Sequence, residues 1–552
     1  MRRVTFICVI LLQSAICFSV LGQQRTINLS DSATFYYQKR DMKKAFEFYE
    51  AYFSSQNSNM NNYSAYYAAV AACHAGNVER AKYYLGRSAE IGYDYLGYDE
   101  IERDSLNICL YGLKEWKVFI TNYKNDTQAK LEQIRRITEG LSDTAKRVNA
   151  SILSNPAYWE EYKNKHTADH LIEHIKSFNN FPSPKNRDFW TLYNIRVNDT
   201  LTVPFLLHIP KSYDAKKKTA LYVYLHGGIA NRTNFSTPAN IPSSLEITVM
   251  DNPATADAFI IYPFGKKSFG WLYHQSAFTT ILNEISMVKS FYNIDDNRVY
   301  VGGHSNGGSG AFWYAINQPS PFAAFFGLNY LPKIYSSNTP FRNLKNNAPF
   351  LGVSGSSDSV FPQATVNGIY RFAIEEGANW QNFNLNGGHT TTIENRDSIG
   401  YLFDTLASTT RNPFQKRIEW ETDNVQNGRN QWIEITELDT LAEKALWHND
   451  LNPTLTQQGK TDVVNFNKNK SGAVIATVKG NIVDIQTSRV KSIKFYVSPD
   501  MFDMANPLKV VVNGREFINS KITPDKNVII DEFLRMKDRV FIVANIIELT
   551  IR

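Results

Sequence analysis

The sequence of 552 residues has little cysteine, and this limits the chemistry that it can carry. Two of its four cysteines, Cys8 and Cys17, lie within the first 22 positions. No C-x-x-C pair occurs, so the sequence shows no sign of a thiolate metal site. Cys73 and Cys109 remain, and both a disulfide and two buried thiols fit their apolar, helix-like surroundings.

Low-complexity segments and a strong charge of one sign are also missing. The net charge is +6, and it falls to +4 when Arg2 and Arg3 are removed. This small excess is spread along the chain, so it gives no argument for a nucleic-acid partner. With 43% hydrophobic residues the chain is an ordinary globular protein, and its length is too great for one core. We therefore expect several domains.

The first 22 residues have the order of a secretory signal peptide. Arg2 and Arg3 precede an apolar run over 4–20, and small residues precede a cleavage point at Gln23. The alternative is an uncleaved anchor, but no stop-transfer pattern follows the run. The sequence therefore predicts a secreted or periplasmic protein with no transmembrane span.

Residues 23–120 have the period of helices, with apolar residues at three- and four-residue steps. Gly76-Asn77 separates two of these runs and predicts a tight turn with a positive φ. The small residues around this turn, with Tyr84, Leu85 and Ala89 downstream, resemble tetratricopeptide repeats. An earlier copy at 40–45 lacks the turn glycine. The resemblance implies a docking surface for a protein partner, and a structural cap is the alternative.

Residues 121–184 are also helical in pattern and are interpreted as a helical linker. His166, His170 and His174 recur at four-residue steps, which predicts one helical face. The last two even spell H-x-x-E-H, a pattern of some zinc peptidases. No distal acidic ligand marks a third position, so we expect packed or solvated histidines and no metal. Phe181–Pro184 breaks the helix and predicts a domain boundary.

Residues 185–412 change to buried strands that alternate with helices, which predicts a doubly wound, parallel sheet. The most informative stretch is Asn297–Gly310, where a short strand, Val299–Val301, leads into Gly303–Gly307 and then a helix. Those five residues have the G-x-S-x-G pattern of a nucleophile elbow, in which a sharp turn exposes the serine. The stretch therefore predicts Ser305 as a nucleophile.

Two further candidates follow strands of the same predicted sheet. Asp358 follows a strand over 350–353, and His389 follows one that ends at 385. The order Ser305, Asp358, His389 is that of a catalytic triad on an α/β-hydrolase sheet. His389 would remove the proton from the serine, and Asp358 would orient the imidazole and stabilise its charged form.

Other residues are predicted to complete the site. The turn after the first core strand places Gly227 to donate its N–H, together with that of Asn306, to an oxyanion. His226, Trp271 and His274 are predicted to wall the substrate pocket. We expect His304 to pack beneath the elbow.

Residues 200–410 resemble the secreted esterases of the polyhydroxybutyrate depolymerase and feruloyl esterase group, within the α/β-hydrolase superfamily. The segments that carry the resemblance are Leu225–Gly228, Tyr292–Tyr300, Gly303–Gly308, Asp358 and Gly388-His389. It implies ester hydrolysis without a cofactor, on an ester substrate that is often an acylated polysaccharide or a polyester. Ser354–Asp358 departs from the His-Gly-x-x-Asp that is commoner there. A serine peptidase of prolyl oligopeptidase type and a non-enzymatic docking protein that uses the helical repeats stay open.

Residues 413–552 alternate short strands with turns such as Gly480-Asn481 and Asn513-Gly514, which predicts a β-sandwich. One of the expected strands covers 527–531. Trp420 and Trp432 would bind carbohydrate if they were exposed, and a packing domain is the alternative. The chain is thus predicted to hold a signal peptide, tetratricopeptide-like helical repeats, a helical linker, an α/β-hydrolase domain and a β-sandwich, over 1–22, 23–120, 121–184, 185–412 and 413–552.

Overall fold

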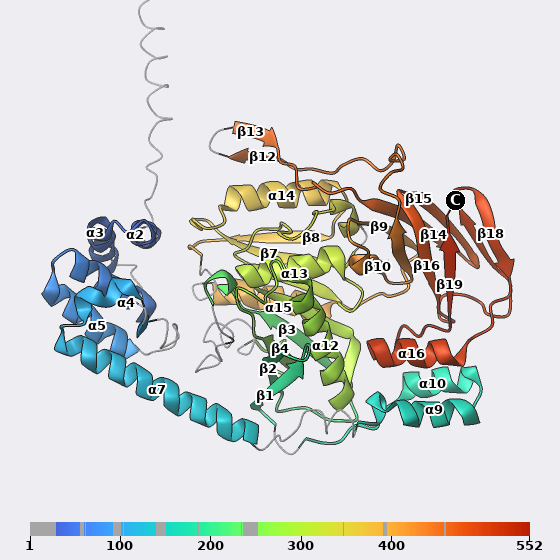
Figure 1. Cartoon of the computed structure of the whole chain (residues 1–552), viewed down its shortest axis with the longest axis horizontal. Helices are drawn as coiled ribbons and strands as arrows, with labels where there is room; N and C mark the ends of the chain where they lie inside the picture. The colour runs from blue at the N-terminus through green and yellow to red at the C-terminus, as the bar shows by residue number, and fades with distance from the viewer. Residues whose placement is uncertain are drawn as a thin grey trace, which may run out of the picture. The chain divides into compact units, whose positions relative to one another are not determined.

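The computed structural model describes residues 29–55, 60, 62–91, 101–102, 104–139, 151–184, 187–232, 235, 252–345, 347–389, 395–457 and 460–551. They form two compact units that divide between Lys124 and Asn125 (Figure 1). The predicted signal peptide lies outside the described residues. Among the helices in the ranges above, none is both long enough and apolar enough to cross a bilayer.

The first unit is made of helices that pack in antiparallel pairs, α2 with α3 and α4 with α5. Gly76 has a φ of +80°, as the sequence predicted for the turn between α4 and α5. In the earlier turn Arg40 takes a φ of 61°, a conformation that costs energy for a residue with a Cβ. The tetratricopeptide interpretation stays a prediction. The elements of this unit are α2 (Leu29–Gln38), α3 (Met42–Phe53), α4 (Asn62–His74), α5 (Val78–Ile91), η1 (Ser105–Leu110) and the start of α7 (Lys114–Glu139).

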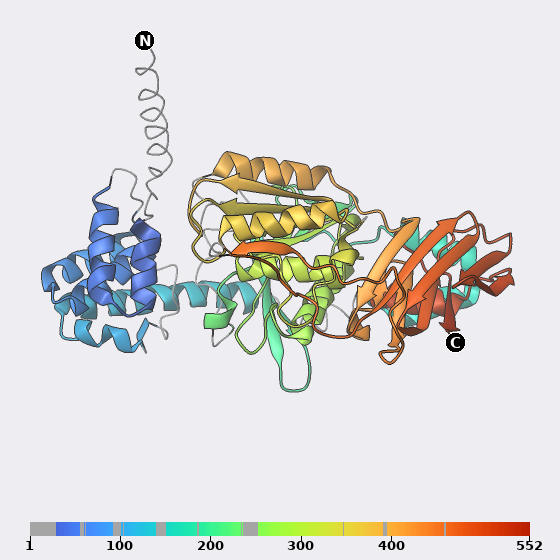
Figure 2. The same cartoon turned by 90° about the horizontal axis from the view of Figure 1, so that it is seen from above.

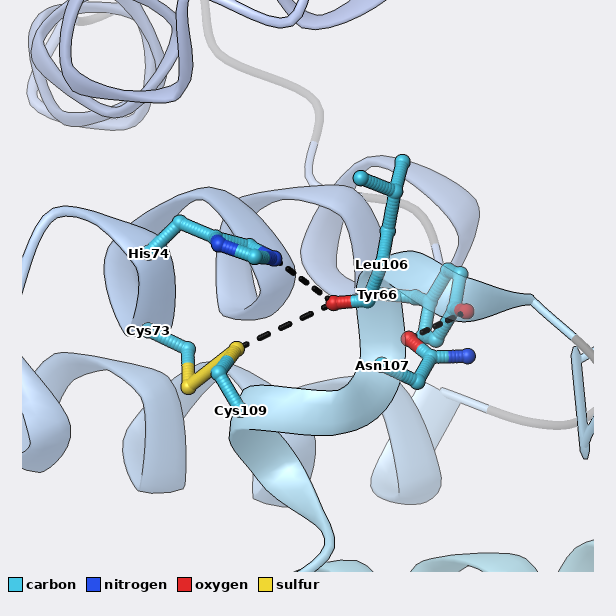
Figure 3. The surroundings of a disulfide bond; sticks show 6 residues. All are labelled: Tyr66, Cys73, His74, Leu106, Asn107 and Cys109. Atoms are coloured by element: carbon cyan, nitrogen blue, oxygen red, sulfur yellow. Dashed lines mark hydrogen bonds between the residues drawn. A yellow bond between two sulfur atoms is a disulfide. The ribbon is translucent and has the colours of Figure 1, made fainter.

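A disulfide between Cys73 and Cys109 joins α4 to η1 (Figure 3). Their Cα atoms lie 6.1 Å apart. Two hydrogen bonds run beside it, from His74 Nε2 to the Leu106 carbonyl at 2.7 Å and from the Tyr66 hydroxyl to the Asn107 side chain at 2.9 Å. Of the two alternatives that the sequence left open, the structure has the disulfide.

The second unit is built on an eight-stranded sheet with the order β1-β2-β4-β3-β5-β6-β7-β8. Strands β3 to β8 are parallel to one another, and the hairpin β1–β2 pairs antiparallel with β4 at one edge. The strands are β1 (Phe189–Arg196), β2 (Thr202–Ile209), β3 (Thr219–Leu225), β4 (Phe259–Pro263), β5 (Ile294–His304), β6 (Ala324–Leu328), β7 (Phe350–Gly355) and β8 (Trp380–Leu385).

Helices cover both faces of this sheet, because alternate residues of the buried strands point to opposite sides. In β3, Leu221 and Val223 belong to the apolar cluster on one face, and Tyr222 and Tyr224 belong to that on the other. Helices α12, α13 and α14 are among those that supply side chains to the first cluster, and α15 supplies side chains to the second, so that α14 and α15 lie on opposite sides (Figure 2). The predicted mixed α/β core is confirmed. The helices are α12 (Gln275–Phe291), α13 (Asn306–Asn317), α14 (Gln363–Glu375) and α15 (Arg396–Ser408).

The predicted linker is in part a structural component of this second unit. Helices α9 (Pro156–Lys165) and α10 (Ala168–Ser177) pack against α16 (Lys526–Met536) from the far end of the chain (Figure 1). The rings of Trp159 and Phe533 meet edge to face with centroids 5.0 Å apart, and both side chains belong to the core of the sheet. Residues 151–184 therefore do not form a separate linker.

The predicted histidine face is wrong, because α9 ends before His166 and only His170 and His174 share α10. The ring of Tyr162 instead stacks between those of His166 and His174, with centroids 4.1 Å from each. His174 Nε2 also lies 2.7 Å from the Tyr158 hydroxyl. Within the described ranges no group of three potential metal ligands is found.

The C-terminal part forms a five-stranded sheet, β18-β17-β15-β14-β9, and a four-stranded sheet, β10-β11-β16-β19, which share one apolar cluster. A short hairpin, β12–β13, packs on α14 (Figure 1). The β-sandwich stays an interpretation. The strands are β9 (Arg417–Thr422), β10 (Arg429–Asn430), β11 (Ile433–Leu438), β12 (Thr454–Gln457), β13 (Lys460–Val463), β14 (Gly472–Lys479), β15 (Ile482–Ser488), β16 (Val490–Val497), β17 (Leu508–Val512), β18 (Arg515–Ser520) and β19 (Asn545–Thr550).

Two predictions for this part are wrong. Trp420 and Trp432 are both 0% exposed, because they fill the cluster between the two sheets and cannot present a ring to a carbohydrate. The expected strand over 527–531 belongs to helix α16. The Asp525 side chain caps this helix by accepting from two backbone N–H groups, and helical spacing places Ile529 and Phe533 together in the core.

Candidate active site

Ser305 lies in the sharp turn between β5 and α13, with a φ of 56° and a ψ of −118°. Tight packing enforces this strained turn. A Cβ on Gly303 or on Gly307 would lie 2.0 Å or 1.8 Å from the Leu225 carbonyl oxygen, so neither position tolerates a side chain. The Ser305 backbone N–H donates to the Leu328 carbonyl at 2.9 Å. The turn is thus fixed on both sides by neighbouring strands, as a nucleophile elbow requires.

The structure brings together the three residues that the sequence predicted as a triad. The Ser305 Oγ lies 3.0 Å from Nε2 of His389, and Nδ1 of His389 lies 2.9 Å from Oδ2 of Asp358. All three follow the carboxyl ends of parallel strands of this sheet, β5, β7 and β8. In this arrangement the hydroxyl donates to Nε2, and the Nδ1–H donates to the carboxylate.

Asp358 is held as a carboxylate. It is 5% exposed, and this burial raises its pKa. Hydrogen bonds from His389, the backbone N–H of Phe361 and Asn329 outweigh the burial, so that the pKa ends below its ordinary value. Its Oδ1 accepts from the N–H groups of Val360 at 2.9 Å and Phe361 at 3.0 Å. The negative charge is therefore available to the imidazole at neutral pH.

Two residues that sequence reasoning did not select for a role at the triad also lie against it. Asn329, which follows β6 directly, donates from Nδ2 to Asp358 Oδ2 at 3.0 Å and to the Gly388 carbonyl at 3.1 Å. His304 Nε2 lies 2.7 Å from the His389 carbonyl. The position of Asn329 directly after a buried strand was a usable signal for a place at this edge of the sheet, because the other candidates also follow buried strands.

The predicted oxyanion-hole residues lie beside Ser305. A Cβ on Gly227 would lie 3.1 Å from both the Cβ of Ser305 and the carbonyl of His304, so the main chain passes close to the elbow. The Asn306 side chain accepts from the Ile229 N–H at 3.0 Å and ties this segment to the first turn of α13. The donation of these N–H groups to an oxyanion stays a prediction.

Two of the three predicted pocket residues lie in the interior. His226 and Trp271 are 3% and 1% exposed, so the prediction that they wall a pocket is wrong. His226 Nε2 accepts from the Gly265 N–H at 3.0 Å, and Trp271 donates to the His226 carbonyl at 3.2 Å. Burial lowers the pKa of His226 well below its ordinary value, so this ring is neutral and supports the turn from inside. His274 lies half-buried at the start of α12, and its role stays a prediction.

No family model matches the sequence, and no curated protein matches it. The chain is similar to solved structures over about two fifths of its length. One is a thermostable esterase, at 20% identity and a TM-score of 0.34, with 40% of this chain and 63% of that one covered. Another is a ferulic acid esterase, at 14% identity and a TM-score of 0.33, with 40% and 99% covered. A third is the Pyrococcus horikoshii acylaminoacyl peptidase, at 15% identity and a TM-score of 0.31, with 40% and 41% covered. This chain thus spans less than two thirds of the length of the thermostable esterase.

Proposed function

We propose that this chain is a serine hydrolase of the α/β-hydrolase superfamily that cleaves carboxylic esters through an acyl-enzyme on Ser305. The observation that carries the proposal is the continuous chain of contacts from the Ser305 Oγ through His389 to Asp358, at 3.0 and 2.9 Å. It begins at a strained elbow and ends at a carboxylate whose lowered pKa keeps it charged.

The chemistry follows from these contacts. His389 Nε2 takes the proton as the Ser305 Oγ attacks the ester carbonyl, and Asp358 stabilises the imidazolium that forms. The N–H groups of Gly227 and Asn306 would stabilise the oxyanion, a contribution of roughly 3–4 kcal/mol for one such donor. The protonated His389 then gives its proton to the leaving alcohol. Water attacks the acyl-enzyme in the same way, with His389 again as the base.

The finer parts of the proposal concern where the chain works and on what. The signal-like N-terminus favours a secreted or periplasmic enzyme. The resemblance to depolymerases and feruloyl esterases favours acyl esters on polysaccharide, or polyesters, as substrates without a cofactor. The first unit would be a tetratricopeptide-like surface for a protein partner, and the C-terminal sheets a β-sandwich that packs on the catalytic part.

Labelling by a fluorophosphonate probe tests the proposal, because the probe reacts only with an activated serine. We expect wild type to be labelled and to hydrolyse p-nitrophenyl acetate, and Ser305→Ala to lose both while it stays folded. A folded wild type that is not labelled would leave the docking protein as the better interpretation. A labelled enzyme that cleaves peptide amides as fast as esters would favour the peptidase.

A further inference from the structure

Two side chains that the proposed mechanism does not use hold the backbone on which His389 sits. Asn329 donates to the carbonyl of Gly388, and His304 contacts the carbonyl of His389 itself. A carbonyl oxygen only accepts hydrogen bonds, so His304 carries its proton on Nε2 and donates from there. Two consecutive carbonyls at the base are therefore held by donors from two different strand ends.

Asn329 also holds the acid of the triad. Its amide nitrogen has two hydrogens, and it lies 3.0 Å from Asp358 Oδ2 and 3.1 Å from the Gly388 carbonyl. The carboxylate oxygen that it contacts is the one that accepts from His389 Nδ1. One amide group thus sets the position of the acid relative to the backbone of the base.

The conformations of these two residues suit this task. Asn329 is 1% exposed, with a φ of 49° that few residues other than glycine, asparagine and aspartate tolerate. Its backbone N–H donates to the Val353 carbonyl at 2.8 Å, so the side chain is placed by the sheet. His304 ends β5, and desolvation followed by the charge of His389 lowers its pKa to about 4. It is therefore a neutral donor at pH 7 and does not compete with His389 as a base.

We propose that Asn329 and His304 act together as a positioning clamp that holds His389 within reach of Ser305 and Asp358. The inference rests on the proposed function, since it concerns how the base of that reaction is held. Neither residue touches the reacting atoms. Both act by keeping the imidazole in the geometry for proton transfer, where small displacements are costly.

Three variants test the clamp. Asn329→Asp has nearly the same shape, but it places a carboxylate oxygen, which accepts hydrogen bonds, against the Asp358 carboxylate and the Gly388 carbonyl, which also accept them. His304→Phe keeps a ring but removes the donor, and His304→Gln returns an amide N–H near the position of Nε2. We expect kcat for p-nitrophenyl acetate to fall about 100-fold in the first two with KM unchanged, and Gln to restore most of it. Asn513→Asp is the matched control, since Asn513 has the same φ of 49° at a turn between β17 and β18.

The double variant Asn329→Asp, His304→Phe distinguishes a clamp from two separate roles. Residues that hold one segment are not additive, so we expect a loss close to that of the more damaging single change. A loss equal to the product of the two single losses overturns the clamp. So does an unchanged kcat in both single variants.

Hydrogen exchange gives a readout that does not depend on activity. We expect the backbone amides of residues 384–389 to exchange faster in Asn329→Asp and His304→Phe than in wild type or Asn513→Asp. Wild type that is not labelled by fluorophosphonate would defeat the proposed function, whereas the exchange rates would still decide on the clamp. Exchange that is unchanged in both variants overturns it.

Discussion

Nε of Arg539 donates to Oδ2 of Asp296 at 3.1 Å, although the two residues lie 243 positions apart. Arg539 follows α16 in the C-terminal part, and Asp296 lies in β5, the strand that leads to Ser305. Their side chains are 3% and 0% exposed. The same carboxylate pairs with Lys289 of α12 at 2.7 Å. A charge from the last part of the chain therefore stabilises the strand that leads to Ser305.

The first prediction concerns this pair. Arg539→Ala removes the guanidinium from the buried Asp296 and leaves it Lys289 and the backbone N–H of residue 539. Loss of one partner of a buried ion pair typically costs about 3–5 kcal/mol. We expect a lower Tm and loss of esterase activity in the same thermal transition. Arg515→Ala, an exposed arginine on β18, is the control and should change neither. Melting of the C-terminal sheets with activity retained would contradict the prediction.

The second prediction concerns Glu284 in α12, which is 0% exposed and has no hydrogen-bond partner for either carboxylate oxygen among the described residues. Burial raises its pKa well above the ordinary value. A raised carboxyl pKa means that the folded state binds a proton more readily than the unfolded state. Its contribution is then most favourable at low pH and is lost as the pH rises above the ordinary glutamate pKa.

Glu284→Gln removes this proton uptake while keeping the shape of the side chain. We expect it to raise stability at pH 8 by on the order of 1 kcal/mol and to change little near pH 4. Urea unfolding at several pH values measures the difference. Glu375→Gln, at an exposed position of α14, is the matched control. A destabilised Glu284→Gln at pH 8 would show that the carboxylate is paired in solution.

The third prediction concerns the acid of the triad. Asp358→Asn keeps the size of the side chain but removes the charge that stabilises the imidazolium and selects its tautomer. We expect kcat to fall by roughly 10⁴-fold. Turnover of p-nitrophenyl acetate beside Asp404→Asn, an exposed residue of α15, measures this. A loss below tenfold would mean that another group orients His389.

The fourth prediction concerns the disulfide of the first unit and whether activity depends on it. The disulfide closes a loop with a sequence separation of 36 residues, and such a crosslink stabilises by about 2–4 kcal/mol. Reduction should therefore lower the melting temperature of the first unit and leave esterase activity intact. The double variant Cys73→Ser, Cys109→Ser should melt at the reduced temperature and no longer respond to reductant. Loss of activity on reduction would show that the units depend on one another.

The triad candidates could be predicted from sequence because each directly follows a buried strand, and strand ends of a parallel sheet meet at one edge. The sequence signal of Ser305 was stronger than those of Asp358 and His389, because the glycines on both sides of it predict the sharp turn. Asn329 also follows a buried strand directly, so its place at this edge of the sheet could be predicted in the same way. The contacts of Asn329 and His304 could not, because they depend on which carbonyls the two side chains reach. Those contacts are set by the path of the loop at His389, for which no local pattern exists.

Two errors have the same physical source. The apolar run over 527–531 favours a strand by propensity, but the cap at Asp525 and helical burial of Ile529 and Phe533 decide for a helix. Trp420 lies on β9, which is buried on both faces, and Trp432 lies in the turn before β11, and the sequence alone does not say that both rings enter the cluster between the two sheets. In both cases tertiary packing overrides local preference.

The apolar core behind Ser305 takes residues from both ends of the second unit, Leu153 and Trp159 on one side and Ile529, Phe533 and Ile542 on the other. Residues 185–412 therefore do not hold the complete core around Ser305 and cannot be expected to fold alone. A fragment over those residues would lose side chains that fill its own interior and would expose apolar surface to self-association. The smallest piece able to keep the site would run from about residue 151 through β19, and the chain is best shortened or fused after α7, because that helix runs across the division between Lys124 and Asn125.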